Sequence, residues 1–158
     1  MRAVDTNILV RLLEQDDSAQ CAAADAYQRT GGPLWVPQVV LVETVWVLST
    51  SYRRTRKEIL GVLEALLGNA DLHLQDEAIV SAAVASFKAS KADFSDCLVL
   101  ETARANGHVP LATFDRNLLK LPDTTQPKAS DPSPPASSPP SSCASGRSAA
   151  AARSTGSP

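Results

Sequence analysis

The residues that offer chemistry in this sequence are four carboxylates from separate parts of the chain. They are Asp5 after a short apolar run, Glu43 inside a long one, Asp96 at the expected start of a helix, and Asp115 after the apolar run 109–112. Three or four carboxylates in one crevice cannot all stay ionised without a cation. Because no His or Cys pair accompanies them, their oxygen donors favour Mg²⁺ or Mn²⁺ over zinc.

Glu43 is the acid with the least ordinary surroundings. It lies in the stretch 36–48, which is apolar on nearly every side and is therefore expected to form a core helix. An ionised carboxylate in a core costs several kcal/mol unless a cation or hydrogen-bond donors meet it. The sequence favours a metal ion as that partner, and a buried ion pair is the alternative.

The three aspartates each have a structural alternative. Asp5, Asp96 and Asp115 stand where an aspartate commonly caps a helix, and Asp93 competes with Asp96 for that role. Their joint placement at strand ends and helix starts favours one shared crevice. A metal ion there, or a pair of ions about 3.5–4 Å apart, activates water and stabilises the charge on a phosphodiester during hydrolysis.

The elements that must position these acids are short apolar runs alternating with helical patterns. Amphipathic helices are expected between short strands at 2–5, 34–36, 72–74 and 109–112. This alternation predicts an α/β fold in which a parallel sheet carries helices on both faces.

The composition fits a single globular domain of ordinary polarity. Of the 158 residues, 44% are hydrophobic and 20% charged, and the net charge of −2 gives no overall attraction for nucleic acid. No apolar run is long enough to span a bilayer, no signal peptide is visible, and the three cysteines lack metal-type spacing. These features predict a cytoplasmic protein with no membrane association.

The composition changes abruptly at Pro122. Pro, Ser and Ala dominate from there to the end, and such a segment cannot bury enough apolar surface to offset the entropy of ordering it. We therefore expect a folded domain over residues 1–121 and a disordered tail over residues 122–158, with no strand after Leu121.

Four short motifs resemble those of a PIN domain, and more narrowly those of the VapC toxins of bacterial type II toxin–antitoxin pairs. The motifs are Asp5-Thr6-Asn7, the stretch around Glu43, the segment 92–96 and Thr113-Phe114-Asp115. The resemblance covers about residues 1–121, with the motifs in the family's order and spacing. It implies a three-layer α/β/α fold with a short-stranded central parallel sheet. It also implies an endoribonuclease that uses Mg²⁺ or Mn²⁺ to activate water.

The resemblance also assigns roles and partners. The metal-binding and catalytic acids would be Asp5, Glu43, Asp96 and Asp115, and the residues that orient these acids or water would be Asn7, Asp93 and Thr113. Proteins of this family form homodimers and are inhibited by a cognate antitoxin. The alternatives are an inactive PIN-like module that only binds an antitoxin, and a PIN nuclease that acts in RNA processing or on DNA.

Basic residues near the acids are candidates for RNA contacts. Arg53, Arg54 and Arg116 are candidates for binding phosphates; the alternative for Arg53 and Arg54, which the sequence favours, is a solvated helix junction, and the alternative for Arg116 is pairing with an acid. Trp35 and Trp46 are expected in the core rather than as platforms for bases. The family usually closes its sheet with one more strand after the last helix, and its apparent loss here suggests the hypothesis of a frameshifted C-terminus.

Overall fold

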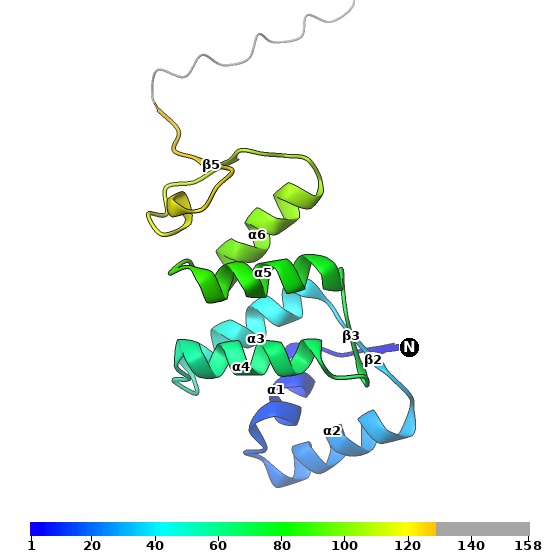
Figure 1. Ribbon diagram of the computed structural model, residues 1–158. Helices are drawn as coiled ribbons and strands as arrows, with labels where there is room; N and C mark the ends of the chain where they lie inside the picture. Colours follow the sequence, from blue (N-terminus) through cyan, green and yellow to red (C-terminus); the bar gives the residue numbers. More distant parts are fainter. Residues whose placement is uncertain (129–158) are drawn as a thin grey trace, which may run out of the picture. The chain divides into compact units, whose positions relative to one another are not determined.

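Helices and short strands alternate along the part of the chain that the computed structural model describes, residues 1–128 (Figure 1). The strands are β1 (Arg2–Ala3), β2 (Leu34–Val36), β3 (Leu72–Leu74), β4 (Leu111–Ala112) and β5 (Thr124–Thr125). The helices are α1 (Thr6–Glu14), α2 (Ser18–Thr30), α3 (Gln38–Thr50), α4 (Arg56–Leu67), α5 (Glu77–Ala89) and α6 (Phe94–Ala105), with a 3-10 helix η1 (Leu118–Lys120). The predicted α/β class is confirmed.

The strands form two parallel sheets. The first has the order β1-β2-β3, with Arg2 opposite Leu34 and Leu34 opposite Leu72. The second contains β4 and β5, with Leu111 opposite Thr124. Within residues 1–128, β1 and β4 are not paired with each other.

The strand β5 corrects the expectation that nothing closes the sheet after Leu121. The Leu111 amide donates to the Asp123 carbonyl at 2.8 Å, and the Thr113 amide donates to the Thr125 carbonyl at 2.9 Å. Backbone hydrogen bonds of this kind need no large apolar side chain. A prediction based on apolar residues therefore missed the strand, because those residues become rare after Pro122. The compact unit extends to Pro127. The predicted disordered tail otherwise lies outside the described residues.

Side-chain caps fix where several helices begin. The Asp5 carboxylate accepts a hydrogen bond from the Ile8 amide at 2.9 Å and so caps α1, while Asp17 caps α2. Helix α4 begins with a capping box, in which the Thr55 hydroxyl accepts from the Glu58 amide and the Glu58 carboxylate accepts from the Thr55 amide. The first of these caps places Asp5, a candidate site residue, between β1 and α1.

An aromatic pair joins α5 to the start of α6. The Phe87 and Phe94 rings meet edge to face with centroids 6.1 Å apart. The Arg56 guanidinium lies 3.6 Å from the centre of the Phe87 ring and donates to the carbonyls of Ser90 and Ala92 at 3.0 and 2.9 Å. The first turn of α4 is thereby fixed to the connection between α5 and α6.

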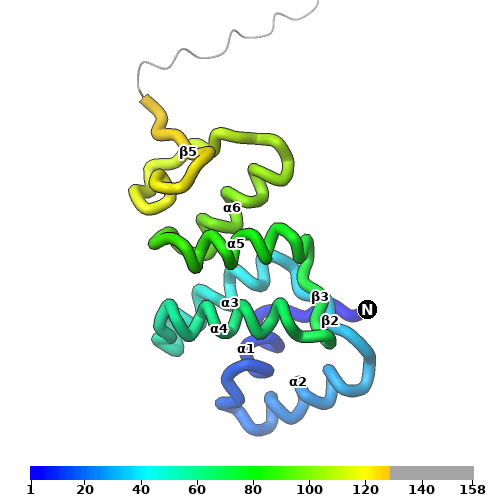
Figure 2. The backbone as a smooth tube through the Cα atoms, in the orientation of Figure 1, coloured from blue at the N-terminus to red at the C-terminus, as the bar shows by residue number. Residues whose placement is uncertain are grey.

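Most of the helices pack against their neighbours in the chain, and α1 also packs against α3 (Figure 2). Helix α5 contacts α6 on one side and α4 on another, while α3 contacts both α1 and α4. Among the residues that the structure describes, no helix has the length and apolar character needed to cross a bilayer.

Candidate functional site

Glu43 lies on the exposed side of α3, and the expectation that it is buried is wrong. Leu41, Thr44 and Leu48 are no more than 1% exposed and form the core face of the helix. Val39 and Trp46, next to Glu43 on the other face, are 70% and 62% exposed, so Trp46 is not a core residue either. The helix is apolar all round because it has a packed face and an uncovered apolar face.

Trp35 is likewise not fully enclosed. It lies in β2 between the buried residues Leu34 and Val36, and 36% of its surface is exposed. Alternation along a strand sends its side chain to the face opposite that of its two neighbours. The prediction that Trp35 is a core residue is therefore wrong.

Glu43 accepts a hydrogen bond from Thr6, a residue to which the sequence analysis gave no role. The Thr6 Oγ1 donates to the Glu43 Oε2 at 2.5 Å, and Thr6 is only 8% exposed. Because Thr6 follows Asp5, this bond brings the end of β1 beside the middle of α3. A small hydroxyl residue next to a candidate acid at a strand end is the signal that marks Thr6.

Asp5 fulfils its capping role with one oxygen only. Its Oδ1 accepts from the Ile8 amide, while within residues 1–128 its Oδ2 accepts no hydrogen bond. The helix-capping alternative is therefore correct for the Oδ1 of Asp5, and its Oδ2 remains available to a ligand. Asn7, the next candidate, is exposed and makes no side-chain hydrogen bond to an acid in the described part of the chain.

The other acids gather at the start of α6 and after β4. Burial, together with the negative charges of Asp115 and Asp93, raises the pKa of Asp96 above that of an ordinary aspartate. The Asp115 Oδ1 accepts from the Asn117 and Leu118 amides at 2.8 and 2.7 Å. These three aspartates therefore form one electrostatically coupled group.

Thr113 supports the turn that carries Asp115. Its Oγ1 accepts a hydrogen bond from the Asp115 amide at 3.0 Å, and its own amide is held by the Thr125 carbonyl of β5. The strand β5 thus helps to position Asp115 through Thr113.

A cavity of about 570 Å³ adjoins both groups of acids. Its acidic lining residues are Glu43 and Asp93, from α3 and from the residue before α6. Its apolar walls come from α3, α4, α5 and α6, and include Val39, Trp46, Ile59, Phe87 and Phe94.

The candidate acids are not brought together at one point in the single chain. Asp5 and Glu43 are joined through Thr6, and Asp93, Asp96 and Asp115 form the second group. Within residues 1–128, no three of these side chains are close enough to hold a metal ion. The donor chemistry, carboxylate oxygens alone, suits Mg²⁺ or Mn²⁺, and the single chain presents it in two parts.

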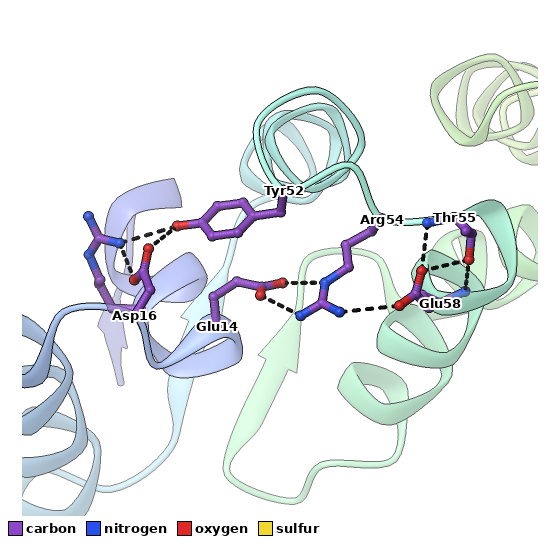
Figure 3. Close-up of polar contacts among 7 residues, drawn as sticks. Glu14, Asp16, Tyr52, Arg54, Thr55 and Glu58 are labelled. Atoms are coloured by element: carbon purple, nitrogen blue, oxygen red, sulfur yellow. Dashed lines mark hydrogen bonds and ion pairs between the residues drawn. The ribbon is translucent and has the colours of Figure 1, made fainter.

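Arg54 is committed to carboxylates of its own chain (Figure 3). It donates to both oxygens of Glu14 at 3.1 and 2.6 Å and to Glu58 at 3.2 Å, and the Glu14 side chain is only 6% exposed. These contacts raise the pKa of Arg54 further above its usual range. Arg54 ties the end of α1 to the start of α4, whereas Arg53 and Arg116 form no ion pair among the described residues.

Comparison with known proteins places the chain in a family. The family description "PIN domain" matches residues 2–123, which is most of the sequence. The chain belongs to the PIN domain family. It is also 24% identical over 124 residues to a "VapC ribonuclease" of Aquifex aeolicus (strain VF5), an alignment that covers 77% of this chain and 92% of that protein. The predicted VapC-like PIN domain and its three-layer α/β/α class are confirmed.

Replacing Asp96 with Asn in this PIN domain is expected to stabilise the metal-free protein at neutral pH. At pH values between the ordinary aspartate pKa and its raised pKa, folded Asp96 keeps a proton that the unfolded chain has already lost. Wild-type stability should therefore fall as the pH rises from the ordinary aspartate pKa, 3.8, through the raised pKa of the folded state. Urea unfolding at pH about 4 and about 7 should show the Asp96→Asn variant gaining on wild type at the higher pH. Equal gains at both values, or the same pattern for the exposed Asp71→Asn control, would contradict the electrostatic account.

Proposed function

We propose that this PIN domain is an endoribonuclease that depends on Mg²⁺ or Mn²⁺ and serves as the toxin of a type II toxin–antitoxin pair. The observation that carries the proposal is the presence of all four motif acids, Asp5, Glu43, Asp96 and Asp115, in a chain related to a protein named VapC ribonuclease. A module that only bound an antitoxin would have no need to keep all four. Bound Mg²⁺ or Mn²⁺ would supply an activated water and neutralise charge on the phosphodiester.

The residues of the chain have separate tasks in this proposal. The four acids would hold the metal, and Asn7, Asp93 and Thr113 would orient acids or water. The Thr6 hydroxyl fixes Glu43, and the hydrogen bonds to the Asp115 Oδ1 leave its second oxygen free for a ligand.

The partners follow from the same proposal. The substrate would be RNA, a cognate antitoxin would inhibit the enzyme, and the protein would be a cytoplasmic homodimer. The apolar outer face of α3, with Val39 and Trp46 beside Glu43, offers surface that a protein partner would cover.

Inducible expression of wild type beside Asp5→Asn tests this function in cells. Asn is as good a helix cap as Asp, so the variant should keep α1 and the fold. Wild type is expected to arrest growth and to produce RNA fragments with defined ends, while Asp5→Asn does neither. Equal behaviour of the two proteins, at equal abundance, would defeat the proposal. Arrest without RNA fragments would instead indicate another target.

Neutralising the unpaired arginines is expected to weaken RNA binding. Arg53→Gln together with Arg116→Gln should reduce affinity and flatten its dependence on salt, by a slope of about 0.7 for each RNA phosphate that is no longer neutralised. The matched control is Arg29→Gln at the exposed end of α2. A salt titration of RNA binding in which the double variant and the control have the same slope would exclude Arg53 and Arg116 from the RNA-binding surface. Arg54 is left unchanged because its replacement would leave the nearly buried Glu14 without its cation.

A further inference from the structure

Trp46 presents a largely exposed aromatic ring beside a candidate catalytic acid. It is 62% exposed and lies one helical turn after Glu43 on α3, so the two side chains share a face of the helix. Val39, on the same face, is 70% exposed. Uncovered apolar surface of this kind marks a site where a ligand or a partner binds.

Trp46 and Glu43 line the cavity of about 570 Å³ that extends from α3 to the start of α6. Within residues 1–128, the other aromatic side chains that line it are Phe87 and Phe94, which are at most 4% exposed and pack edge to face on each other. Trp46 is therefore the aromatic wall whose ring is open to a ligand. The volume lies within the range of about 300–1,000 Å³ that is usual for small-ligand sites.

Arg56 supplies a fixed cation to the same cavity. Its Nη2 donates to the Ser90 and Ala92 carbonyls at 3.0 and 2.9 Å, and its guanidinium lies 3.6 Å from the centre of the Phe87 ring. In the described part of the chain, its Nε and Nη1 make no hydrogen bond. Arg56 is thus held by one nitrogen and keeps two nitrogens as donors for an anion, whereas Arg54, which also lines the cavity, is occupied by carboxylates.

An open indole ring, a fixed guanidinium and adjacent acids fit one nucleotide of a single-stranded nucleic acid. Any base stacks on an aromatic ring, and a guanidinium binds phosphate. Because Glu43 and Asp93 line the cavity, an RNA cleaved at the acids would place a neighbouring nucleotide in it. An apolar segment of a protein would leave the free donors of Arg56 without an acceptor, so the charge of the cavity favours the nucleotide.

We propose that this cavity is a nucleotide-binding subsite, in which the base of an unpaired RNA nucleotide stacks on Trp46 and its phosphate binds Arg56. The inference rests on the proposed function for the identity of the polymer, and it adds where a nucleotide next to the cleaved bond is held. Because every base can stack, the subsite selects single-stranded over paired RNA rather than one sequence. A protein inhibitor that covers the same face would compete with RNA for it.

Binding of a single-stranded RNA of about 12 nucleotides to the Asp5→Asn protein in Mg²⁺ tests the subsite without cleavage. Adding Trp46→Ala should weaken binding between about 5-fold and 100-fold, and Trp46→Phe should retain most of the affinity. An abasic RNA of the same length should bind the parent and the Trp46→Ala protein equally. The control is Tyr27→Ala, which removes an aromatic ring that is 38% exposed on α2. Trp46→Ala binding as tightly as this control, or losing affinity equally for abasic RNA, would overturn the inference and leave the face to a protein partner.

Arg56→Lys tests the phosphate contact separately from the base. Lysine keeps the positive charge and a donor for the carbonyls that Arg56 contacts, but it loses the planar fork. The variant should bind both the ordinary and the abasic RNA more weakly than the parent, by a similar factor. Unchanged binding of both RNAs by a folded Arg56→Lys protein would overturn the role of Arg56.

Tryptophan fluorescence gives a readout that does not depend on activity. The sequence has two tryptophans, so Trp35→Phe leaves Trp46 as the reporter and Trp46→Phe leaves Trp35. Single-stranded RNA should quench the emission of Trp46 and leave that of Trp35 unchanged, and abasic RNA should quench neither. Trp46 emission that changes with protein concentration and not with RNA would show that a second copy covers the ring, and would overturn the inference.

Cleavage assays separate the subsite from the proposed function. In the protein with Asp5 intact, Trp46→Ala should raise the KM for single-stranded RNA by a larger factor than it lowers kcat. Quenching of Trp46 by RNA without any cleavage by wild type would support the subsite and reject the ribonuclease. Cleavage with the same KM in wild type and Trp46→Ala would support the ribonuclease and overturn the subsite.

Discussion

Glu43→Gln is expected to lower metal-dependent RNA cleavage by about 100-fold or more, because removing a metal ligand costs at least as much as removing a residue that only orients one. The variant should fold normally, since Glu43 is exposed and the amide oxygen of Gln can still accept from the Thr6 hydroxyl. The measurement is the initial rate of cleavage of a labelled RNA at saturating Mg²⁺, with unfolding in urea as the test of the fold.

The control for Glu43→Gln is Glu77→Gln, which makes the same change at an exposed position in the first turn of α5. It should cleave RNA at the wild-type rate. A Glu43→Gln protein that cleaves as well as this control would exclude Glu43 from the site. A variant that no longer folds would show that Glu43 is a structural partner of Thr6.

Phe94→Ala is expected to have the largest effect on stability, about 3–5 kcal/mol in the free energy of unfolding. Phe94 is 1% exposed, packs edge to face on Phe87, and is the first residue of α6. Its removal leaves a cavity at the point where α4, α5 and α6 meet. Urea unfolding followed by circular dichroism measures the loss of stability.

The comparison for Phe94→Ala is Val39→Ala, because both side chains line the same cavity while Val39 is 70% exposed. The exposed substitution should change the free energy of unfolding by no more than about 0.5 kcal/mol. Similar losses of stability in the two variants would mean that the aromatic pair does not anchor α6.

The helix α3 shows which structural features could be predicted from the sequence and which could not. Its position and its start after Pro37 were predictable from an apolar run that follows a proline. The exposure of Glu43 was not, because a helix that is apolar all round is expected to be enclosed. The sequence does not distinguish a face that packs in the core from an apolar face left open on the surface, and Val39 and Trp46 belong to the second kind.

The C-terminal strand was missed for a different reason. β5 consists of Thr124 and Thr125, and it is held to β4 by backbone groups rather than by apolar side chains. A pattern of apolar residues cannot reveal such a strand. The strand β5 also supports Thr113, because the Thr125 carbonyl accepts from the Thr113 amide. The Thr113 hydroxyl in turn accepts from the Asp115 amide.

Three of the candidate acids could be placed at element ends because strand ends and helix starts can be located in a sequence, and their roles stay predictions. The distances between the acids could not be predicted, since these depend on how β1 and β4 are arranged in space. The structure joins Asp5 to Glu43 and couples Asp96 to Asp115, and it leaves the two groups apart in the single chain. Thr6, which links the first group, was missed because its one sequence signal, a small hydroxyl residue beside a candidate acid at a strand end, was not used.

The most direct test of the central claim is cleavage of a labelled single-stranded RNA by the purified protein as Mg²⁺ is added, removed with EDTA and restored. The account predicts that wild type cleaves only with the metal, that restoring Mg²⁺ restores cleavage, and that Asp5→Asn stays inactive throughout. Cleavage that persists in EDTA, or that Asp5→Asn shares with wild type, would contradict a metal-dependent site built on these acids.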